Sequence, residues 1–223
     1  MKMNKNIAAF LFCLISIAGN AQNEDWVGRN WVGRDEFVNS PGGFVAGYTN
    51  NQFRYHLDDG NTYGSFKGSE KFLHGWYAGF VFEINCFRGV GIYLGSMVEN
   101  LYALGGEFST SNGKYTDYKE WAVYSPVHLQ FKMPLNRHDA VGIHAGVGVT
   151  RIVSSAFTDS KGYLKETDAY DEYGMKKTQI SFDWGVYLQM RKIRMDVAWQ
   201  YGLTELVENV YKNGFRVGFD FLF

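Results

Sequence analysis

Hydrophobic and polar residues alternate along the end of the chain, from Gly214 to Phe223. Successive side chains of a β-strand point to opposite faces, so the alternation sorts these residues into two sets. One face carries Phe215, Val217, Phe219, Phe221 and Phe223. The other face carries Gly214, Arg216, Gly218, Asp220 and Leu222. An apolar face that backs onto a face with ionisable groups is typical of a strand between lipid and a polar lumen.

The same period of two predicts eight strands. They are expected at 43–49 (continuing through Phe53 and Tyr55), 75–85, 90–104, 121–133, 140–152, 179–190, 193–202 and 214–223. Most of them reach ten residues, about the length that a tilted transmembrane strand needs. Beyond residue 21 the chain has no apolar run long enough for a membrane-spanning helix. A membrane protein of this kind is then expected to be a closed barrel.

The connections between these strands alternate in length. Short turns are expected at 87–89, 134–138 and 191–192, and long polar connections at 50–74, 105–120, 154–178 and 204–213. Barrels of the outer membrane have short periplasmic turns and longer extracellular loops. We therefore predict an all-β fold for residues 43–223, an eight-stranded antiparallel up-and-down transmembrane β-barrel with both termini in the periplasm.

The short turns also predict which residues face each other. A two-residue turn at 191–192 and a turn centred on Asn136 both match apolar with apolar and polar with polar residues. A slip by one residue would mix the two faces. The expected pairs are Met190 with Ile193, Phe131 with Val141, and His128 with His144.

The N-terminal residues 1–21 have the organisation of a secretory signal peptide. Lys2 and Lys5 precede an apolar run at 7–18, and small residues precede Gln22. Cys13 follows the bulky Phe12, which does not suit a lipid-attachment site. We expect export and removal of this segment.

Residues 22–42 are expected to form a periplasmic or interfacial segment. They contain the tetrapeptide Trp-Val-Gly-Arg twice, at 26–29 and 31–34. Trp and Arg side chains are common at the headgroup level of a membrane. The alternative is that the repeat docks a periplasmic partner or enters the barrel as a plug.

Net charge and cysteine content limit the kinds of partner and cross-link that this chain is expected to have. Without residues 1–21 the chain has 20 basic residues (22 less Lys2 and Lys5) and 23 acidic ones, so its net charge is −3. Nothing here predicts a nucleic-acid partner. Cys86 is then the one remaining cysteine, which leaves no intramolecular disulfide.

Ten polar or ionisable residues fall on the face expected to line the lumen. They are Glu83, Glu99, His128, Lys132, His144, Asp183, Arg194, Asp196, Arg216 and Asp220. The interior of an eight-stranded barrel is just wide enough for side chains to fill it, and an unpaired buried charge is costly. We expect these residues to pair across strands and plug the lumen. A path for ions or protons is the alternative.

The two lumen histidines could also hold a metal ion, with a carboxylate as third ligand. Their spacing matches no metal-binding motif, so neither a metal nor another cofactor is expected. An outer-membrane lipid-modifying enzyme would need a nucleophile, a histidine and an acid at one level. No serine neighbours His128 or His144 along the same strand, and the nearby Ser125 is expected to face lipid. We predict no catalytic residue and no enzyme.

Several stretches resemble the PorT-like outer-membrane β-barrel family of Bacteroidetes, often described as porin-family proteins. The similar stretches are 75–83, 95–99, 123–129, 144–148, 182–185 and 200–204, and the signal ending at 20–22 resembles signals of that phylum. The resemblance implies the fold and the cell outer membrane as location, but no single activity. It also points to a role in secretion.

The terminal Phe219, Phe221 and Phe223 resemble the signal by which outer-membrane barrels are recognised for assembly. The implied partners are outer-membrane lipid, the barrel-assembly machinery and an unidentified envelope protein. The long connections, with their mixed charges and aromatic residues, are the expected place for such binding.

Two functions remain open at this point. The first is a structural or interaction component of the envelope with a plugged lumen. The second is a narrow porin-like pore for ions or small solutes. The competing fold is a soluble lipocalin-type barrel with its apolar face inside. The terminal phenylalanine, the alternating connections, the ionised second face and the lack of disulfides favour the membrane barrel.

Overall fold

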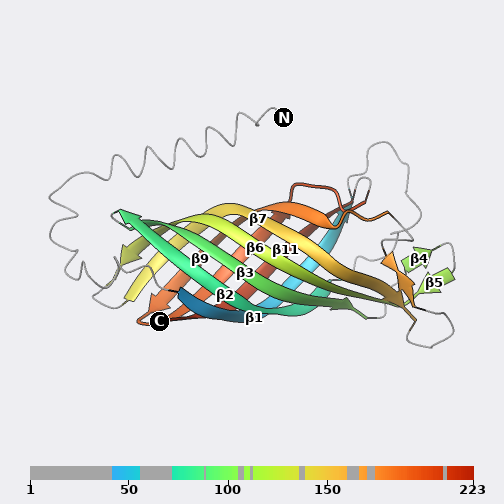
Figure 1. The fold of residues 1–223 in the computed structure, drawn as a ribbon, viewed down its shortest axis with the longest axis horizontal. Helices are drawn as coiled ribbons and strands as arrows, with labels where there is room; N and C mark the ends of the chain where they lie inside the picture. The colour runs from blue at the N-terminus through green and yellow to red at the C-terminus, as the bar shows by residue number, and fades with distance from the viewer. Residues whose placement is uncertain are drawn as a thin grey trace, which may run out of the picture.

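The computed structural model describes residues 42–55, 72–87, 89–104, 108–110, 113–135, 139–159, 166–169, 174–207 and 210–223. The expected signal peptide, the Trp-Val-Gly-Arg repeat and parts of the long connections lie outside these residues. Almost all of the described chain is β-strand (Figure 1). Among these residues, no helix has the length and apolarity needed to cross a bilayer.

Eight strands form the wall of a closed barrel. They are β1 (Gly42–Tyr55), β2 (Leu73–Phe87), β3 (Val90–Ala103), β6 (Asp117–Pro134), β7 (Asp139–Thr158), β9 (Thr178–Met190), β10 (Ile193–Gly202) and β11 (Val210–Leu222). Each pairs antiparallel with the next along the chain, and β11 pairs with β1 to close the ring. The predicted eight-stranded antiparallel barrel is confirmed.

Three short strands lie in the long connections. They are β4 (Phe108–Thr110), β5 (Gly113–Tyr115) and β8 (Thr167–Asp168). The β4–β5 hairpin lies beyond the barrel wall at one end, and the C-terminus lies at the other (Figure 1). We call the end with the short connections after β2, β6 and β9 the turn end, and the opposite one the loop end.

The strands are staggered around the ring. Starting at Phe131 and moving each time to the paired residue on the neighbouring strand, one meets in order Ile143, Val186, Val197, Val217, Tyr48, Trp76, Asn100 and Trp121. This path leaves β6 at residue 131 and returns to β6 at residue 121, a displacement of ten residues. A stagger of this kind requires the strands to tilt against the barrel axis, as Figure 1 shows.

The two faces of the wall differ in chemistry. Outward-facing Phe80, Val127 and Ile143 are 53%, 53% and 49% exposed, whereas inward-facing Glu83 and Arg194 are fully buried. A soluble lipocalin-type barrel would have the opposite arrangement, so this alternative is wrong. The apolar side chains lie on the outside along β6 and β9 and along most of β7, which alternate with a period of two. In β7 the alternation changes phase after Val153, where the pairing with Trp121 and Ala122 is irregular.

One predicted register is wrong. The short connection after β6 brings Pro134 opposite Ala140, so Phe131 faces Ile143 and His128 faces Gly146. The turn is centred one residue later than expected, which shifts the pairing by two residues. A shift by two leaves every side chain on its own face, so the alternation does not detect it. The predicted pair of Met190 and Ile193 is confirmed.

The loop end of the lumen holds an apolar cluster that the sequence did not predict. Its larger members are Phe53, Leu73, Leu101, Tyr115, Tyr118, Ile152, Phe157, Met175, Leu206 and Val210. Strand β6 begins earlier than expected, at Asp117, and strand β7 ends later than expected, at Thr158. Their extensions carry Tyr118 and Phe157 into this cluster, so the wall continues past the ionised part of the lumen.

A charge on the outer wall should be costly. We expect Val127→Lys to lower the free energy of unfolding in lipid vesicles by about 2–4 kcal/mol, because an ammonium group would enter hydrocarbon. Urea titration of the refolded barrel measures this change. The matched control is Val153→Lys near the loop end of β7, where a residue is 66% exposed and the cost should fall to about 0–1 kcal/mol. Equal costs at both positions would contradict a lipid-facing Val127.

Candidate functional site

The structure places all ten sequence-predicted lumen residues inside the barrel. Nine are buried, and the side chain of Asp196 retains 16% exposure. They come from seven strands of the wall. Their contacts form two groups, one nearer the turn end and one nearer the loop end.

The first group surrounds Arg194, the second residue of β10. Its Nη1 lies 2.7 Å from Glu83 Oε1, its Nη2 3.2 Å from Asp196 Oδ2, and its Nε 3.6 Å from Asp220 Oδ2. Lys132 Nζ donates to the other oxygen of Glu83 at 2.8 Å. Two cations thus share three carboxylates in an interior that is buried except for part of Asp196, and such pairing is the condition under which buried charges are tolerated.

Two aromatic rings lie against the Arg194 guanidinium. Its central carbon lies 3.7 Å from the ring centre of Tyr187 and 4.6 Å from that of Tyr93. Gln130 Oε1 accepts a further hydrogen bond from Nη1 at 3.0 Å. A planar guanidinium can stack on rings and donate in its plane at the same time, which an ammonium group cannot do. This part of β10 therefore specifically requires arginine.

The second group surrounds Arg216 on β11. Its guanidinium pairs with Glu99 and lies 3.3 Å from the ring centre of Tyr124. The Tyr124 hydroxyl donates to Asp183, which also accepts from Ser181 Oγ at 2.7 Å. Tyr124 thus links the ion pair of β3 and β11 to the carboxylate on β9.

A further ion pair nearer the loop end was missed. Lys212 Nζ lies 2.6 Å from Glu120 Oε1, with both side chains almost completely buried. Both residues have the inward parity of their strands, since Lys212 lies two residues before Gly214 and Glu120 two before Ala122. Extending the alternation of β11 and β6 by one more step would have found them.

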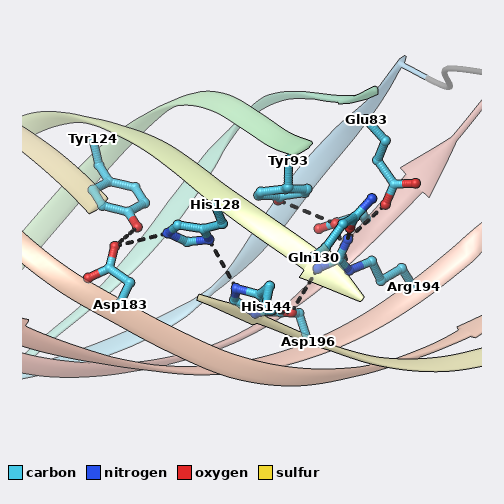
Figure 2. Close-up of polar contacts among 10 residues, drawn as sticks. Glu83, Tyr93, Tyr124, His128, Gln130, His144, Asp183, Arg194 and Asp196 are labelled. Atoms are coloured by element: carbon cyan, nitrogen blue, oxygen red, sulfur yellow. Dashed lines mark hydrogen bonds and ion pairs between the residues drawn. The ribbon is translucent and has the colours of Figure 1, made fainter. Parts of the chain in front are cut away.

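The two histidines connect the groups (Figure 2). His128 Nε2 lies 3.2 Å from Asp183 Oδ2, and His144 Nε2 lies 2.9 Å from Asp196 Oδ2. The two Nδ1 atoms are 2.9 Å apart, a hydrogen-bonding distance. The side-by-side placement on β6 and β7 that the sequence suggested is present, although the residues are diagonal rather than opposite in the register.

Glycines on β7 make room for these large side chains. A Cβ atom at Gly146 would lie 2.6 Å from the Cα atom of His128, and one at Gly148 2.6 Å from the ring of Tyr124. Gly142 lies against the ring of Tyr187. The glycine-rich inner face of this strand is therefore explained by the bulk that it faces.

The arrangement does not resemble a hydrolytic site. Ser181 donates to Asp183 rather than to an imidazole, so His128 is not placed to activate its hydroxyl. Ser125 has the outward parity of β6. Within the described chain, no three histidine, cysteine, aspartate or glutamate residues are arranged to hold a metal ion.

The terminal phenylalanines lie on the outer wall at the turn end. Phe219, Phe221 and Phe223 are all exposed there, and the ring of Phe223 lies 5.6 Å from that of Phe44 on β1. The amide of Phe223 donates to Gly42 O at 2.9 Å. These residues therefore border the seam where the first and last strands meet. Their part in assembly stays a prediction.

These features define the class of protein. A closed ring of strands bonds its backbone groups internally, as hydrocarbon requires. The outer wall is apolar, aromatic residues such as Trp76, Trp121 and Tyr201 lie toward the loop end, and the ionised groups are inside. The protein is an integral eight-stranded β-barrel of the bacterial outer membrane.

No protein-family model matches the chain, and no curated protein does either. Solved structures of outer-membrane barrels are similar to it. Ail, the attachment invasion locus protein of Yersinia pestis, solved with the heparin analogue sucrose octasulfate, is 15% identical, with a TM-score of 0.42 over 82% of this chain and 99% of that one. Neisserial surface protein A is 8% identical, with a TM-score of 0.46 over 82% and 97%. OprG from Pseudomonas aeruginosa is 15% identical, with a TM-score of 0.43 over 82% and 94%.

Proposed function

We propose that this protein is a structural or interaction component of the cell envelope whose lumen is closed by its own side chains. The observation that carries the proposal is the pairing of the lumen charges. Arg194 with Glu83 and Arg216 with Glu99 occupy the interior where a pore would need water. An eight-stranded barrel has little interior space beyond its side chains.

The loop-end cluster supports the same proposal. Leu101, Tyr118, Ile152 and Phe157 are at most 1% exposed, and they lie where solute would enter from the loop end. Apolar side chains in contact with one another exclude water. A lumen with ion pairs in its middle and an apolar core at its mouth suits a rigid scaffold rather than a conduit.

The partner of such a scaffold would bind outside the lumen. We propose that the long connections or the segment 22–42 engage another envelope protein, since loops on a rigid barrel are suited to recognition. The stretches from 75–83 to 200–204 support a PorT-like barrel and hence a role associated with secretion. Phe219, Phe221 and Phe223 would serve the assembly machinery during insertion.

A planar bilayer experiment tests the closed lumen. We expect no discrete conductance steps from protein that shows the heat-dependent gel shift of a folded barrel, because the paired charges leave no continuous water path. An established porin, refolded in the same way, serves as the positive control.

Reproducible steps would instead support the narrow pore. In that case Glu99→Gln should change the ion selectivity, since Glu99 would line the conducting path. A silent bilayer from wild type and from Glu99→Gln would support closure and direct the search for partners to the loop end.

A further inference from the structure

We propose that His128 and His144 form one binding site for a single proton, and that this proton joins the two halves of the network that closes the barrel. The inference rests on the closed lumen proposed above. It adds a specific protonation state to that network and makes the joint between its halves sensitive to pH.

The contact between the two imidazoles is the first step. Their Nδ1 atoms are 2.9 Å apart, their ring planes differ by 18°, and their ring centres are 4.9 Å apart. Rings stacked face to face cannot approach this closely, so the short contact lies nearly in the plane of both rings. A nitrogen lone pair lies in that plane too. An N–H···N hydrogen bond therefore fits, with one nitrogen protonated and the other not.

The far nitrogens are the second step. His128 Nε2 makes a hydrogen bond with Asp183 Oδ2 at 3.2 Å, and His144 Nε2 lies 2.9 Å from Asp196 Oδ2 as an ion-pair contact without a hydrogen bond. An unprotonated nitrogen would place its lone pair against a carboxylate, so both Nε2 atoms should carry protons. The pair then holds three protons on four nitrogens and has one positive charge. With two protons, either a nitrogen faces a carboxylate without a hydrogen or the two Nδ1 lone pairs face each other; with four protons, two N–H groups face each other.

The charges around the pair favour this count. Asp183, Asp196, Tyr93 and Tyr187 contact the pair directly. The network that extends from these residues also holds Tyr77 and Glu83 on β2, Glu99 on β3, Tyr124 and Lys132 on β6, Arg194 on β10, and Arg216 and Asp220 on β11. This network has five carboxyl groups and three permanent cations, so acidic groups exceed cations by two. One proton on the histidine pair reduces this excess to one.

The proton matters for the whole network because the histidine pair lies between the group around Arg194 and the group around Arg216. Asp183 belongs to the group around Arg216, and Asp196 to the group around Arg194. The hydrogen bond between the histidines is where these two groups meet (Figure 2). Loss of the proton or gain of a second one would remove a favourable contact at this joint.

A metal ion and a proton path fit less well. Two nitrogens bound to one tetrahedral zinc ion at about 2.0–2.1 Å would be about 3.3 Å apart, farther than the 2.9 Å observed here. A relay along the lumen would stop at Arg194, since a guanidinium does not give up its proton. The geometry points to a local proton site.

Nitrogen-15 NMR of histidine-labelled protein in detergent micelles tests the site directly. Near pH 7 we expect three protonated ring nitrogens and one unprotonated one from this pair, with a scalar coupling across the Nδ1···Nδ1 contact. His128→Gln and His144→Gln assign the signals. Two neutral imidazoles without a coupling between them would overturn the proposal. Zinc added to zinc-free protein at neutral pH should leave the spectrum unchanged; tight zinc binding at these nitrogens that displaces the proton would also overturn the proposal.

The pH dependence of thermal unfolding gives a second readout. The midpoint of the gel-shift transition should vary in the wild type between about pH 5 and pH 8, where histidine titrates, and His144→Gln should lose most of this variation. His74→Gln is the matched control, since His74 lies on the outer wall and bonds Tyr48 at 2.5 Å. Equal pH dependence in all three proteins would overturn the proposal. Conductance steps together with a shared proton would refute the closed lumen alone, and a silent bilayer with two independent imidazoles would refute the proton site alone.

Discussion

Arg194→Met should lower the free energy of unfolding by about 3–5 kcal/mol, the cost of leaving buried charges without their partner. Methionine keeps most of the side-chain length and volume, so the loss would come mainly from the charge. Unfolding of the refolded barrel by urea in vesicles, followed by tryptophan fluorescence, measures the change. A smaller yield of heat-shifted protein would accompany it.

The reason lies in how many groups depend on this guanidinium. Glu83, Asp196 and Asp220 all lie within 3.6 Å of it, and its own side chain is fully buried. Removal would leave Asp220 and Asp196 facing each other's charge with little solvent. The stacking on Tyr93 and Tyr187 would be lost as well. Each of these cation–π contacts is worth about 2 kcal/mol when desolvated.

Arg151→Met is the matched control. Arg151 is an exposed arginine on β7 whose Nη1 donates to Thr178 Oγ1 at 2.7 Å. Its replacement should change stability by about 0.5 kcal/mol or less, as for most surface substitutions. Similar losses for Arg194 and Arg151 would mean that the lumen is hydrated enough to solvate the freed carboxylates, which would favour the pore.

The faces of the strands could be predicted because one physical rule controls them. A barrel in a membrane must keep charges inside and apolar groups outside along every strand. Residues such as Glu83, Asp183 and Arg194 therefore have their positions dictated by parity alone, and the structure places them in the lumen. The alternation of short and long connections further indicates that neighbouring strands in the sequence pair with each other in the wall.

Contacts between distant strands could not be predicted in the same way. Parity places Arg194 and Glu83 inside but does not say that the two meet, because β10 and β2 are separated by β11 and β1 in the wall. Whether Arg194 and Glu83 meet across the lumen depends on the stagger of ten residues, and the stagger is the sum of the registers that the individual connections set. The turn after β6 was misplaced by one residue for the reason that a shift of two preserves the pattern.

The loop-end cluster was missed for a different reason. Tyr115, Met175 and Leu206 lie in connections whose composition is polar overall. Their burial depends on how the connections fold back over the barrel mouth, a tertiary effect that local alternation does not contain. The sequence signal that could have indicated this cluster is the presence of isolated apolar residues within otherwise polar connections.

The strength of a single lumen pair can be isolated with a double-mutant cycle on Glu83 and Lys132. We expect Glu83→Gln to cost about 3–5 kcal/mol, because Glu83 is fully buried and its two oxygens bind two cations. Lys132→Met should cost less, about 1.5–3 kcal/mol, since Glu83 keeps its contact with Arg194. The double variant should cost less than the sum of the two, with a coupling energy of about 1–3 kcal/mol.

The exposed pair of Lys176 and Glu205 offers the matched cycle. Their charged atoms are 3.4 Å apart, with side chains 58% and 33% exposed. Solvent and salt screen such a pair, so its coupling energy should stay below about 1 kcal/mol and fall further in added salt. The lumen cycle should be almost insensitive to salt, because ions do not reach a closed interior. A lumen coupling that falls with salt as the surface one does would show that water and ions enter the barrel, and the closed scaffold would then have to give way to the pore.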